Sequence, residues 1–367
     1  MRKLTMLIWI LAIIVFLALC VFAYLQLPIF GAKPTGERLQ RMQASLHYQN
    51  GKFHNLTPTQ TITGDKSMVR ATWDFLFHGN KNVRPSTPVP AIKTDLTQLP
   101  HDKNAYVWLG HSTYFMQLDG KRFLIDPVLT AITPLPFGGK PFLGTDIYQA
   151  DDLPAVDYLI ITHDHYDHLE YDTVKRIKER VGKVIAPLGV GAHLARWGYR
   201  PEQIIELDWQ QKIKLAQGFE LTALPARHAS GRALSSNNTL WASYLLQTPS
   251  ETIYLGGDSG YDPYFQTIGK TYPNISLAIL ENGQYSKDWA QIHLLPDDLI
   301  HAIKDLNPHT VITVHHSKFE LATHDWNEPL KRFSENAERE HIRYAVPKIG
   351  EVWDLTQKKE VKDKWWE

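Results

Sequence analysis

One short polar segment constrains the fold of this chain more than any other part of its sequence. Residues 163–168 read His-Asp-His-Tyr-Asp-His, so three histidines and two aspartates stand within six positions. The strongly apolar residues 158–161 end one residue before this segment and predict a buried strand, and helical spacing follows from Asp172. Burying so many polar side chains is costly unless each finds a partner. Imidazole and carboxylate groups are good ligands for zinc, iron and manganese, so the segment predicts a metal site at the end of a strand.

The spacing within the segment indicates how the ligands are shared. Side chains two residues apart in an extended chain point to the same side, so His163 and His165 can bind one metal ion. Asp167 and His168 follow where the chain turns into the helix, and they can reach a second ion nearby. The alternative, a solvated loop with histidines placed by chance, suits a lone histidine but not a cluster of this density.

The N-terminus contains a second constraining feature, a run of twenty uncharged residues. Residues 6–25 are almost all apolar, and a helix of that length spans about 30 Å, the thickness of a bilayer core. The run has no polar face, which disfavours a buried core helix, and no small-x-small cleavage site follows it. We therefore expect residues 1–26 to form an uncleaved membrane anchor.

Basic residues on both flanks of this anchor indicate its orientation. Arg2 and Lys3 precede it directly, whereas Lys33, Arg38 and Arg41 lie further beyond its end. The positive-inside rule then favours a cytoplasmic N-terminus, with the bulk of the protein, residues 27–367, on the non-cytoplasmic side. The sequence thus predicts a single-pass membrane protein, in a bacterial inner membrane.

Composition narrows the classes of partner and ligand. Lysine plus arginine and aspartate plus glutamate both number 39, so there is no basic excess to indicate nucleic-acid binding. The single cysteine, Cys20, lies inside the apolar run, so the rest of the chain has neither a disulfide nor a thiolate ligand. Any metal site must therefore use nitrogen and oxygen ligands. The sequence leaves the oligomeric state open.

Strand-like and helix-like patterns alternate in the larger part of the chain. Residues 27–104 are rich in proline and turns, and they predict a linker followed by a segment that packs on the main domain. Hairpins and crossover helices fill residues 105–367, which predicts a single α/β sandwich with helices outside the sheets. The expected strands are 106–109, 114–118, 122–125, 158–161, 184–186, 221–224, 240–246, 252–255, 276–280 and 310–314, and the expected helices are 172–181 and 296–306.

The pattern His-x-His-x-Asp-His at 163–168 resembles the signature of the metallo-β-lactamase superfamily. That resemblance implies an αββα sandwich with two metal ions at one edge, between the sheets. It also implies further ligands at later strand ends, where His228, Asp258 and His315 stand. The implied ligands are His163, His165 and His228 for the first metal, Asp167, His168 and His315 for the second, and Asp258 as the bridge between them.

Two further assignments depend on the same resemblance. His315 and His316 are adjacent, and His315 is chosen because the superfamily places an aromatic residue directly after this ligand. Asp126, within Leu-Ile-Asp-Pro, resembles the superfamily's early aspartate. We expect it to support the metal loop rather than to bind metal itself.

The implied chemistry is hydrolysis by a dinuclear centre. Two cations about 3.5–4 Å apart can share one water, lower its pKa and present a bridging hydroxide at neutral pH. Asp167 and Asp258, as ligands of that centre, are the expected catalytic residues. No motif for a serine or cysteine nucleophile stands out. Two zinc ions are expected, with iron and manganese left open because all the ligands are nitrogen and oxygen.

Segments outside the ligands narrow the resemblance to N-acylphosphatidylethanolamine-hydrolysing phospholipase D and its bacterial relatives. The likeness extends from about residue 105 to 353 and departs at His316, where the lipid enzymes carry tryptophan. It implies a phosphodiesterase that acts on a membrane phospholipid, and an anchor would raise the local concentration of such a substrate. The segments that carry it are 108–113, 226–232, 238–243, 256–261, 281–285, 314–319 and 327–329.

Four residues are candidates for substrate contact. Arg232 follows a predicted ligand by four positions and can bind a phosphate oxygen, with a solvated surface arginine as the alternative. His111 and His293 are candidates for substrate contact or for protonation of the leaving group, although a structural role is the alternative for each. Tyr261, in the segment that follows Asp258, completes the set.

Two other functions are compatible with the same ligands. A lactonase or other carboxylic-ester hydrolase would keep the metals and change the electrophile. A non-catalytic, membrane-tethered metal-binding protein would keep the ligands without turnover. A site that has lost its activity usually also loses a ligand, so the complete predicted set argues against this alternative. The resemblance supports the fold and the metal ions more strongly than it supports the exact lipid substrate.

Overall fold

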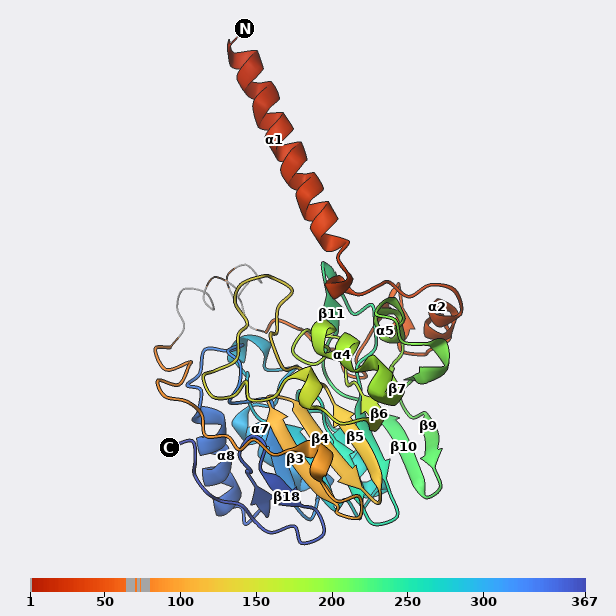
Figure 1. The fold of residues 1–367 in the computed structure, drawn as a ribbon, viewed down its shortest axis with the longest axis vertical. Helices are drawn as coiled ribbons and strands as arrows, with labels where there is room; N and C mark the ends of the chain where they lie inside the picture. The colour runs from red at the N-terminus through yellow and green to blue at the C-terminus, as the bar shows by residue number, and fades with distance from the viewer. Residues whose placement is uncertain (1, 64–69, 71–72, 74–79) are drawn as a thin grey trace.

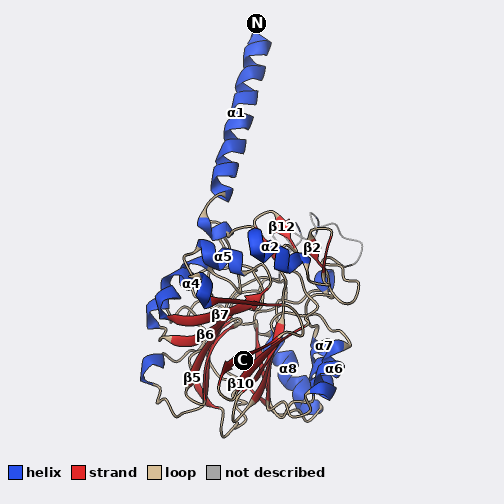
Figure 2. Ribbon diagram, turned by 90° about the vertical axis from the view of Figure 1, so that its right-hand side faces the viewer, coloured by secondary structure: helices blue, strands red, loops and turns tan. Residues whose placement is uncertain are grey.

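Two seven-stranded sheets face each other in the computed structural model, with helices on their outer sides (Figures 1 and 2). The structure describes residues 2–63, 70, 73 and 80–367. One continuous core of buried apolar side chains is formed by strands of both sheets and by the helices that cover them. This arrangement confirms the predicted αββα sandwich.

The first sheet joins an antiparallel meander to a parallel half. In spatial order its strands are β18 (Val352–Asp354), β3 (Ala105–Gly110), β4 (Thr113–Leu118), β5 (Lys121–Ile125), β6 (Val156–Ile160), β7 (Val181–Pro187) and β8 (Ile204–Leu207). Pairing is antiparallel from β18 to β5 and parallel from β5 to β8. The β4–β5 turn is Asp119-Gly120, and both residues have positive φ (47° and 76°), as a two-residue hairpin of this kind requires.

The second sheet likewise joins an antiparallel part to a parallel part. In spatial order its strands are β17 (Tyr344–Ala345), β16 (Val311–Val314), β15 (Leu277–Glu281), β14 (Thr252–Leu255), β13 (Ser243–Gln247), β10 (Phe219–Leu224) and β9 (Lys212–Ala216). The strands from β17 to β14 run parallel, and those from β14 to β9 run antiparallel. A short separate hairpin, β11 (Gly231–Arg232) with β12 (Ser235–Ser236), lies outside both sheets.

Helices cover the outer sides of the two sheets. On the first sheet's side lie α4 (Tyr171–Ile177) and α5 (Gly191–Arg196), and on the second sheet's side lie α6 (Tyr264–Thr271), α7 (Pro296–Leu306) and α8 (Glu328–Arg339) (Figure 2). The helix α7 crosses between the parallel strands β15 and β16. It begins with a proline, and it ends at Asn307 in the left-handed conformation that closes many helices.

The N-terminal helix α1 (Arg2–Leu25) projects away from the sandwich, and none of its residues is buried (Figure 1). It is long and apolar enough to cross a membrane. A signal sequence near an N-terminus meets the same criteria, so length and composition suit either role.

The chain after α1 turns back along the sandwich. The helix α2 (Gly36–Gln43) contributes buried Met42, and Phe53 of the β1–β2 hairpin (Tyr48–Gln49 and Lys52–Phe53) enters the same core. The amide of Asn55 donates to the carbonyl oxygen of a predicted ligand residue, His228, and accepts from its N–H. Residues 27–104 therefore contact the region of the predicted site, and the boundary at residue 104 stays a prediction.

Candidate metal centre

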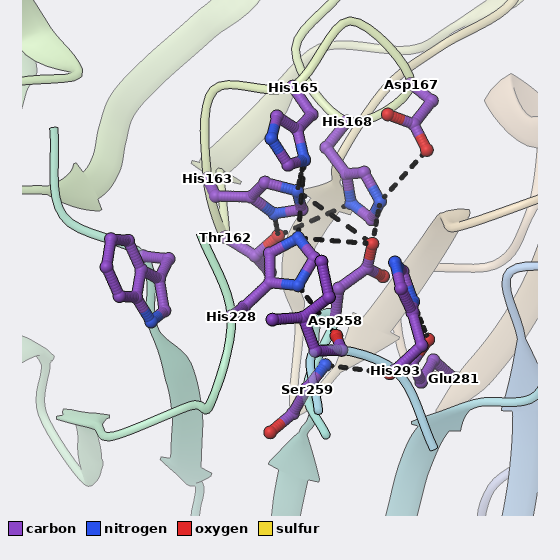
Figure 3. Close-up of polar contacts among 12 residues, drawn as sticks. Thr162, His163, His165, Asp167, His168, His228, Asp258, Ser259, Glu281 and His293 are labelled. Carbon is purple, nitrogen blue, oxygen red and sulfur yellow. Dashed lines mark hydrogen bonds and ion pairs between the residues drawn. The ribbon is translucent and has the colours of Figure 1, made fainter. Parts of the chain in front are cut away.

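The predicted ligands converge at one edge of the sandwich, although they come from distant parts of the chain (Figure 3). The segment 163–168 follows β6 of the first sheet, whereas His228, Asp258 and His315 follow β10, β14 and β16 of the second. Each ligand-bearing loop begins just beyond the carboxyl end of a buried strand. The strands fix where the loops start, so both sheets contribute to a site between them.

Three imidazole rings form the group predicted for the first metal. His163 Nε2 lies 2.9 Å from His165 Nδ1, and His228 Nε2 lies 3.3 Å from the same His165 atom. The other nitrogen of His228 is 2.8 Å from the carbonyl oxygen of Ile292 and can donate to it, which leaves Nε2 with a free lone pair. Three nitrogens facing one another in this way can share one cation.

Asp167, His168 and His315, the residues predicted for the second metal, also lie together. Together with His111 they place ligand atoms within 4.8 Å of one another. His168 Nε2 is 3.5 Å from Asp167 Oδ2, and that oxygen is 3.0 Å from His111 Nε2. The structure thus brings the predicted set together and adds His111 to it.

Asp258 lies between the two groups, the place predicted for a bridging ligand. Its Oδ2 is 3.1 Å from His168 Nε2 and 3.9 and 3.8 Å from the Nε2 atoms of His163 and His228. Its Oδ1 is 3.2 Å from His315 Nδ1. One carboxylate therefore reaches both ligand groups. We call these seven residues the His/Asp cluster: His163, His165, Asp167, His168, His228, Asp258 and His315.

The buried polar atoms of the cluster fit a metal centre. Among the described residues, His168 Nε2, His315 Nε2 and Asp258 Oδ1 are buried without a hydrogen-bond partner. An unpartnered buried polar atom costs about 1–3 kcal/mol, and a coordinated cation would satisfy all three. Burial also lowers the pKa of His163 and His228 well below the ordinary value, which favours the neutral imidazole that binds metal.

Asp126 supports the metal loop from behind, as its predicted role requires. It follows β5 directly and has positive φ (42°), which turns its carboxylate under the 163–168 segment. The carboxylate accepts hydrogen bonds from the Thr162 N–H at 2.8 Å and from its hydroxyl at 2.6 Å. It also lies 2.8 Å from His168 Nδ1, which directs Nε2 of that ring into the cluster.

Replacing Asp126 with asparagine is expected to weaken metal binding without removing a ligand. An amide cannot fix the His168 tautomer as a carboxylate does, and partners of this kind are worth roughly 10–100-fold in metal affinity. Metal titration of the purified full chain measures the change. Asp151→Asn, at an exposed carboxylate that pairs with Arg176, is the matched control. Equal affinities for the wild type and Asp126→Asn would contradict the supporting role.

The structure places His315, and not its neighbour, in the cluster. His315 adopts positive φ (69°), which non-glycine residues rarely do, and its N–H donates to the carbonyl of His111. Its carbonyl approaches Gly283 so closely that a Cβ there would lie 2.4 Å from the oxygen. His316 points elsewhere, with its ring 4.8 Å from that of Trp108 and Nε2 3.2 Å from the Thr313 carbonyl.

Arg232, predicted to contact substrate, binds backbone carbonyls of the protein itself in this structure, and its contact with substrate stays a prediction. Its side chain is buried, and its guanidinium donates to the carbonyl of Asp164 at 2.7 Å and to that of Ile29 at 3.1 and 3.2 Å. The same group lies over the ring of Tyr166, 4.1 Å from its centroid. These contacts use most of its donors, so Arg232 links the metal loop to the chain just after α1.

The side chain of Tyr261, also predicted to contact substrate, faces a helix instead of the cluster, and its contact with substrate stays a prediction. Its hydroxyl donates to Asp305 Oδ2 at 2.6 Å, and its ring stacks against Phe265. The hydrogen bond to Asp305, together with burial, raises the pKa of Tyr261 to about 12. Tyr261 therefore joins α6 to α7.

His111 and His293, the remaining substrate candidates, occupy different positions. His111 is fully buried beside Asp167, with its ring 4.3 Å from that of His315, so it lies behind the cluster and not on a surface that substrate reaches. Its contact with substrate stays a prediction. His293 does line the open cleft, and its Nδ1 is 2.6 Å from Glu281 Oε2.

Two acidic residues next to the cluster had no predicted role. Glu281 ends β15, and besides His293 it accepts from the N–H groups of Ser259 and Leu294. Asp164, between two predicted ligands, lies 3.2 Å from His193 Nε2 and accepts from the Gly231 N–H at 2.8 Å. An acid at the end of a fully buried strand was the available signal for Glu281.

The cluster opens on a cleft with a volume of about 420 Å³. His165, Asp167, Asp258, His293 and His315 form its floor, and apolar side chains form part of its wall. The apolar residues of the wall are Ile62, Ala229, Trp289, Ile292 and Leu321. A ligand in this cleft would therefore meet the metal-binding groups with one end and an apolar surface with another.

An αββα sandwich with histidines and aspartates gathered at one edge defines a class of metal-dependent hydrolases. The chain belongs to the metallo-β-lactamase superfamily, because the family described as the beta-lactamase superfamily domain matches residues 121–316. That range includes the whole His/Asp cluster.

Similarity to individual proteins extends over most of the chain. A protein of Mycobacterium tuberculosis described as uncharacterized is 38% identical over 322 residues, which cover 86% of each chain. N-acyl-phosphatidylethanolamine-hydrolyzing phospholipase D 1 of Caenorhabditis elegans is 28% identical over 313 residues, 80% of this chain and 87% of that protein. A metallo hydrolase structure from Ignicoccus hospitalis has a TM-score of 0.53 at 20% identity, covers 68% of this chain and 97% of its own, and supports the fold alone.

Proposed function

We propose that this protein is a membrane-anchored phosphodiesterase of the phospholipase D type, acting on N-acylphosphatidylethanolamine-like lipids with two bound metal ions. The observation that carries the proposal is the His/Asp cluster, in which one carboxylate reaches both ligand groups at the floor of an open cleft. Similarity to the Caenorhabditis elegans phospholipase supports the choice of a phosphodiester. Zinc is the proposed metal, since the ligands are imidazole and carboxylate.

The cluster residues fit the groups that such a centre needs. His163, His165 and His228 would hold one cation, Asp167, His168 and His315 the other, and Asp258 would bridge them. Cations bound there would lower the pKa of a shared water and neutralise charge that develops on phosphoryl oxygens. In the overall reaction the water oxygen bonds to phosphorus, the bond from phosphorus to the head-side oxygen breaks, and phosphatidic acid and an alcohol result.

His293 is placed to give a proton to the departing alcohol. Glu281 holds its Nδ1, which leaves Nε2 as the ring nitrogen available to a substrate oxygen in the cleft. The His293 ring also stacks on His315, 5.4 Å between centroids, so it lies beside the cluster without being one of the predicted ligands. Glu281 positions the ring, and His293 carries the proton.

The anchor would serve the same substrate. α1 has the length and polarity of a membrane span, and Arg2 and Lys3 at its start favour a cytoplasmic N-terminus. The catalytic domain would then act on lipids from the non-cytoplasmic side of the membrane. Apolar side chains such as Trp289, Ile292 and Leu321 would contact the lipid part of the substrate.

Lipid hydrolysis tests the proposal directly. Purified full-length protein, loaded with zinc in detergent micelles, is incubated with N-acylphosphatidylethanolamine, and both phosphatidic acid and the N-acylethanolamine are quantified. We expect both products in equal amounts, and neither with chelated protein. Turnover of lactones or β-lactams without hydrolysis of the lipid or of bis-p-nitrophenyl phosphate would assign a carboxylic-ester hydrolase and contradict the proposal.

Replacing His293 with asparagine is expected to separate two kinds of leaving group. Hydrolysis of the natural lipid should fall by about 100-fold because an alkoxide needs a proton to leave. Hydrolysis of bis-p-nitrophenyl phosphate should fall by less than about fivefold because nitrophenolate leaves without one. The kcat of both reactions is measured together with metal content, and His301→Asn, at an exposed position on α7, is the control. Equal losses on both substrates would contradict the role of His293 as an acid.

A further inference from the structure

Two loops outside the cluster carry large apolar side chains that stand exposed. Leu234, at the tip of the β11–β12 hairpin, is 87% exposed. Phe137 and Leu135, in the irregular loop 131–139, are 69% and 46% exposed. Single exposed apolar residues are normal on soluble proteins. Whether Leu135, Phe137 and Leu234 share a function therefore depends on where they lie in the structure.

Both loops are tied by hydrogen bonds to the chain at the end of α1. The Tyr24 hydroxyl, in the last turn of that helix, donates to the Pro134 carbonyl at 2.6 Å. Arg232, in the hairpin, donates to the Ile29 carbonyl, only four residues beyond the end of the helix at Leu25. The views in Figures 1 and 2 agree that the β11–β12 hairpin lies at the end of the sandwich from which α1 projects.

The same hairpin borders the mouth of the cleft. Gly231 and Ser236, on its two strands, line the cleft that the cluster opens into. The Gly231 N–H also donates to Asp164 in the metal loop. The exposed side chain at the hairpin tip is therefore joined, through its own strands, to both the cleft wall and the base of α1.

We infer that Leu135, Phe137 and Leu234 insert into the lipid surface at which α1 ends, and so hold the mouth of the cleft against the bilayer. The inference rests on the proposed role of α1 as a membrane anchor. Apolar side chains at the depth of the headgroups add to a single anchor, and exposed Lys33 and Lys140 nearby suit an anionic leaflet. A lipid in that leaflet would then enter the cleft without crossing water.

Depth measurements test this contact independently of catalysis. The chain has one cysteine, Cys20, which lies exposed in α1, so a nitroxide attached to the wild type reports on the anchor itself. A Cys20→Ser, Leu234→Cys variant reports on the hairpin. Full-length protein is reconstituted in vesicles of phosphatidylethanolamine and phosphatidylglycerol, and accessibility to oxygen is compared with accessibility to a water-soluble nickel chelate.

We expect both labels to be in lipid, and a label at Ile92 to be in water. Ile92 is the matched control because it is 44% exposed and pairs with Ile349 near the edge strand β18. A Leu234 label in water with a Cys20 label in lipid would overturn the inference and leave the anchor intact. Both labels in water would overturn the anchor together with the inference.

Activity provides a second readout that separates membrane contact from damage to the fold. A Leu135→Ser, Phe137→Ser, Leu234→Ser variant should lose at least about threefold in hydrolysis of bilayer lipid, because fewer apolar groups hold it at the surface. Its rate on soluble bis-p-nitrophenyl phosphate and its melting temperature should equal those of Ile92→Ser. Equal rates of the two variants on bilayer lipid would overturn the inference, and a loss on both substrates would do so as well.

Discussion

Replacing Asp258 with asparagine is expected to abolish most of the hydrolytic activity. Asp258 is, among the described residues, the carboxylate that lies within 4 Å of both ligand groups, with Oδ2 3.1 Å from His168 and 3.8 Å from His228. Asparagine keeps its size but removes the negative charge that two cations would share. We expect kcat/KM to fall by more than about 100-fold. This loss would exceed the roughly 10–100-fold effect of replacing a residue that only hydrogen-bonds to a metal ligand.

The measurement combines kinetics with metal content. Bis-p-nitrophenyl phosphate hydrolysis gives kcat/KM, and elemental analysis of the same samples gives metal bound per chain, which should fall for Asp258→Asn. The control is Asp157→Asn, since Asp157 is a partly exposed carboxylate on β6 that contacts Lys121 on the neighbouring strand β5. Equal rates and equal metal content in Asp258→Asn and the wild type would contradict the bridging role. Full metal content without turnover in the wild type would instead favour a metal-binding protein that is not an enzyme.

Most of what the sequence indicated about the site came from the spacing of residues within the metal loop, 163–168. A buried strand before 163–168 set the starting point, and alternation placed His163 and His165 on one side. The partners from the second sheet could be chosen only by resemblance, because no local pattern links His228 to a loop 60 residues earlier. The structure supplies that link through the two sheets, which bring β6 and β10 to the same edge.

Helix boundaries show where periodicity misled. The expected helix 172–181 ends at Ile177 and is followed by a 3-10 turn, Lys178–Arg180, because Val181 already begins β7 and pairs with Val156. Val181 stands four residues after Ile177, so its apolar side chain fitted a helical face in the sequence. Pairing with the neighbouring strand decided the conformation of Val181. The spacing of residues in one sequence carries no information about which strands pair.

Side-chain direction was the main quantity that the sequence could not give. Arg232 and Tyr261 stand within four residues of predicted ligands, yet one turns toward the carbonyls of Asp164 and Ile29 and the other toward α7. Glu281 is the opposite case. A lone acidic residue after apolar residues forms no motif, yet the carboxylate of Glu281 holds His293 at the cleft. Proximity in sequence predicts proximity in space and leaves orientation to the surrounding backbone.

Metal removal is expected to lower the melting temperature of the protein. Without cations, the buried atoms His168 Nε2, His315 Nε2 and Asp258 Oδ1 have no hydrogen-bond partner, and the contacts of Asp258 with the two histidines offset this burial in part, so the folded state is less stable. A ligand present at 1,000 times its dissociation constant stabilises by about 4 kcal/mol, so chelation should lower the melting temperature by roughly 4–8 °C. Differential scanning calorimetry of the full chain in detergent, with and without a strong chelator, measures the shift.

Zinc added back should restore the transition, and chelator already saturated with zinc should leave it unchanged. The Asp258→Asn variant provides the internal control. Because this variant should hold less metal, chelation removes less stabilisation, and its melting temperature should change little. An identical shift in the wild type and this variant would locate the effect at another metal-binding position. An unshifted transition in the wild type would mean that the His/Asp cluster binds no metal in the folded protein, and the hydrolase proposal would lose its basis.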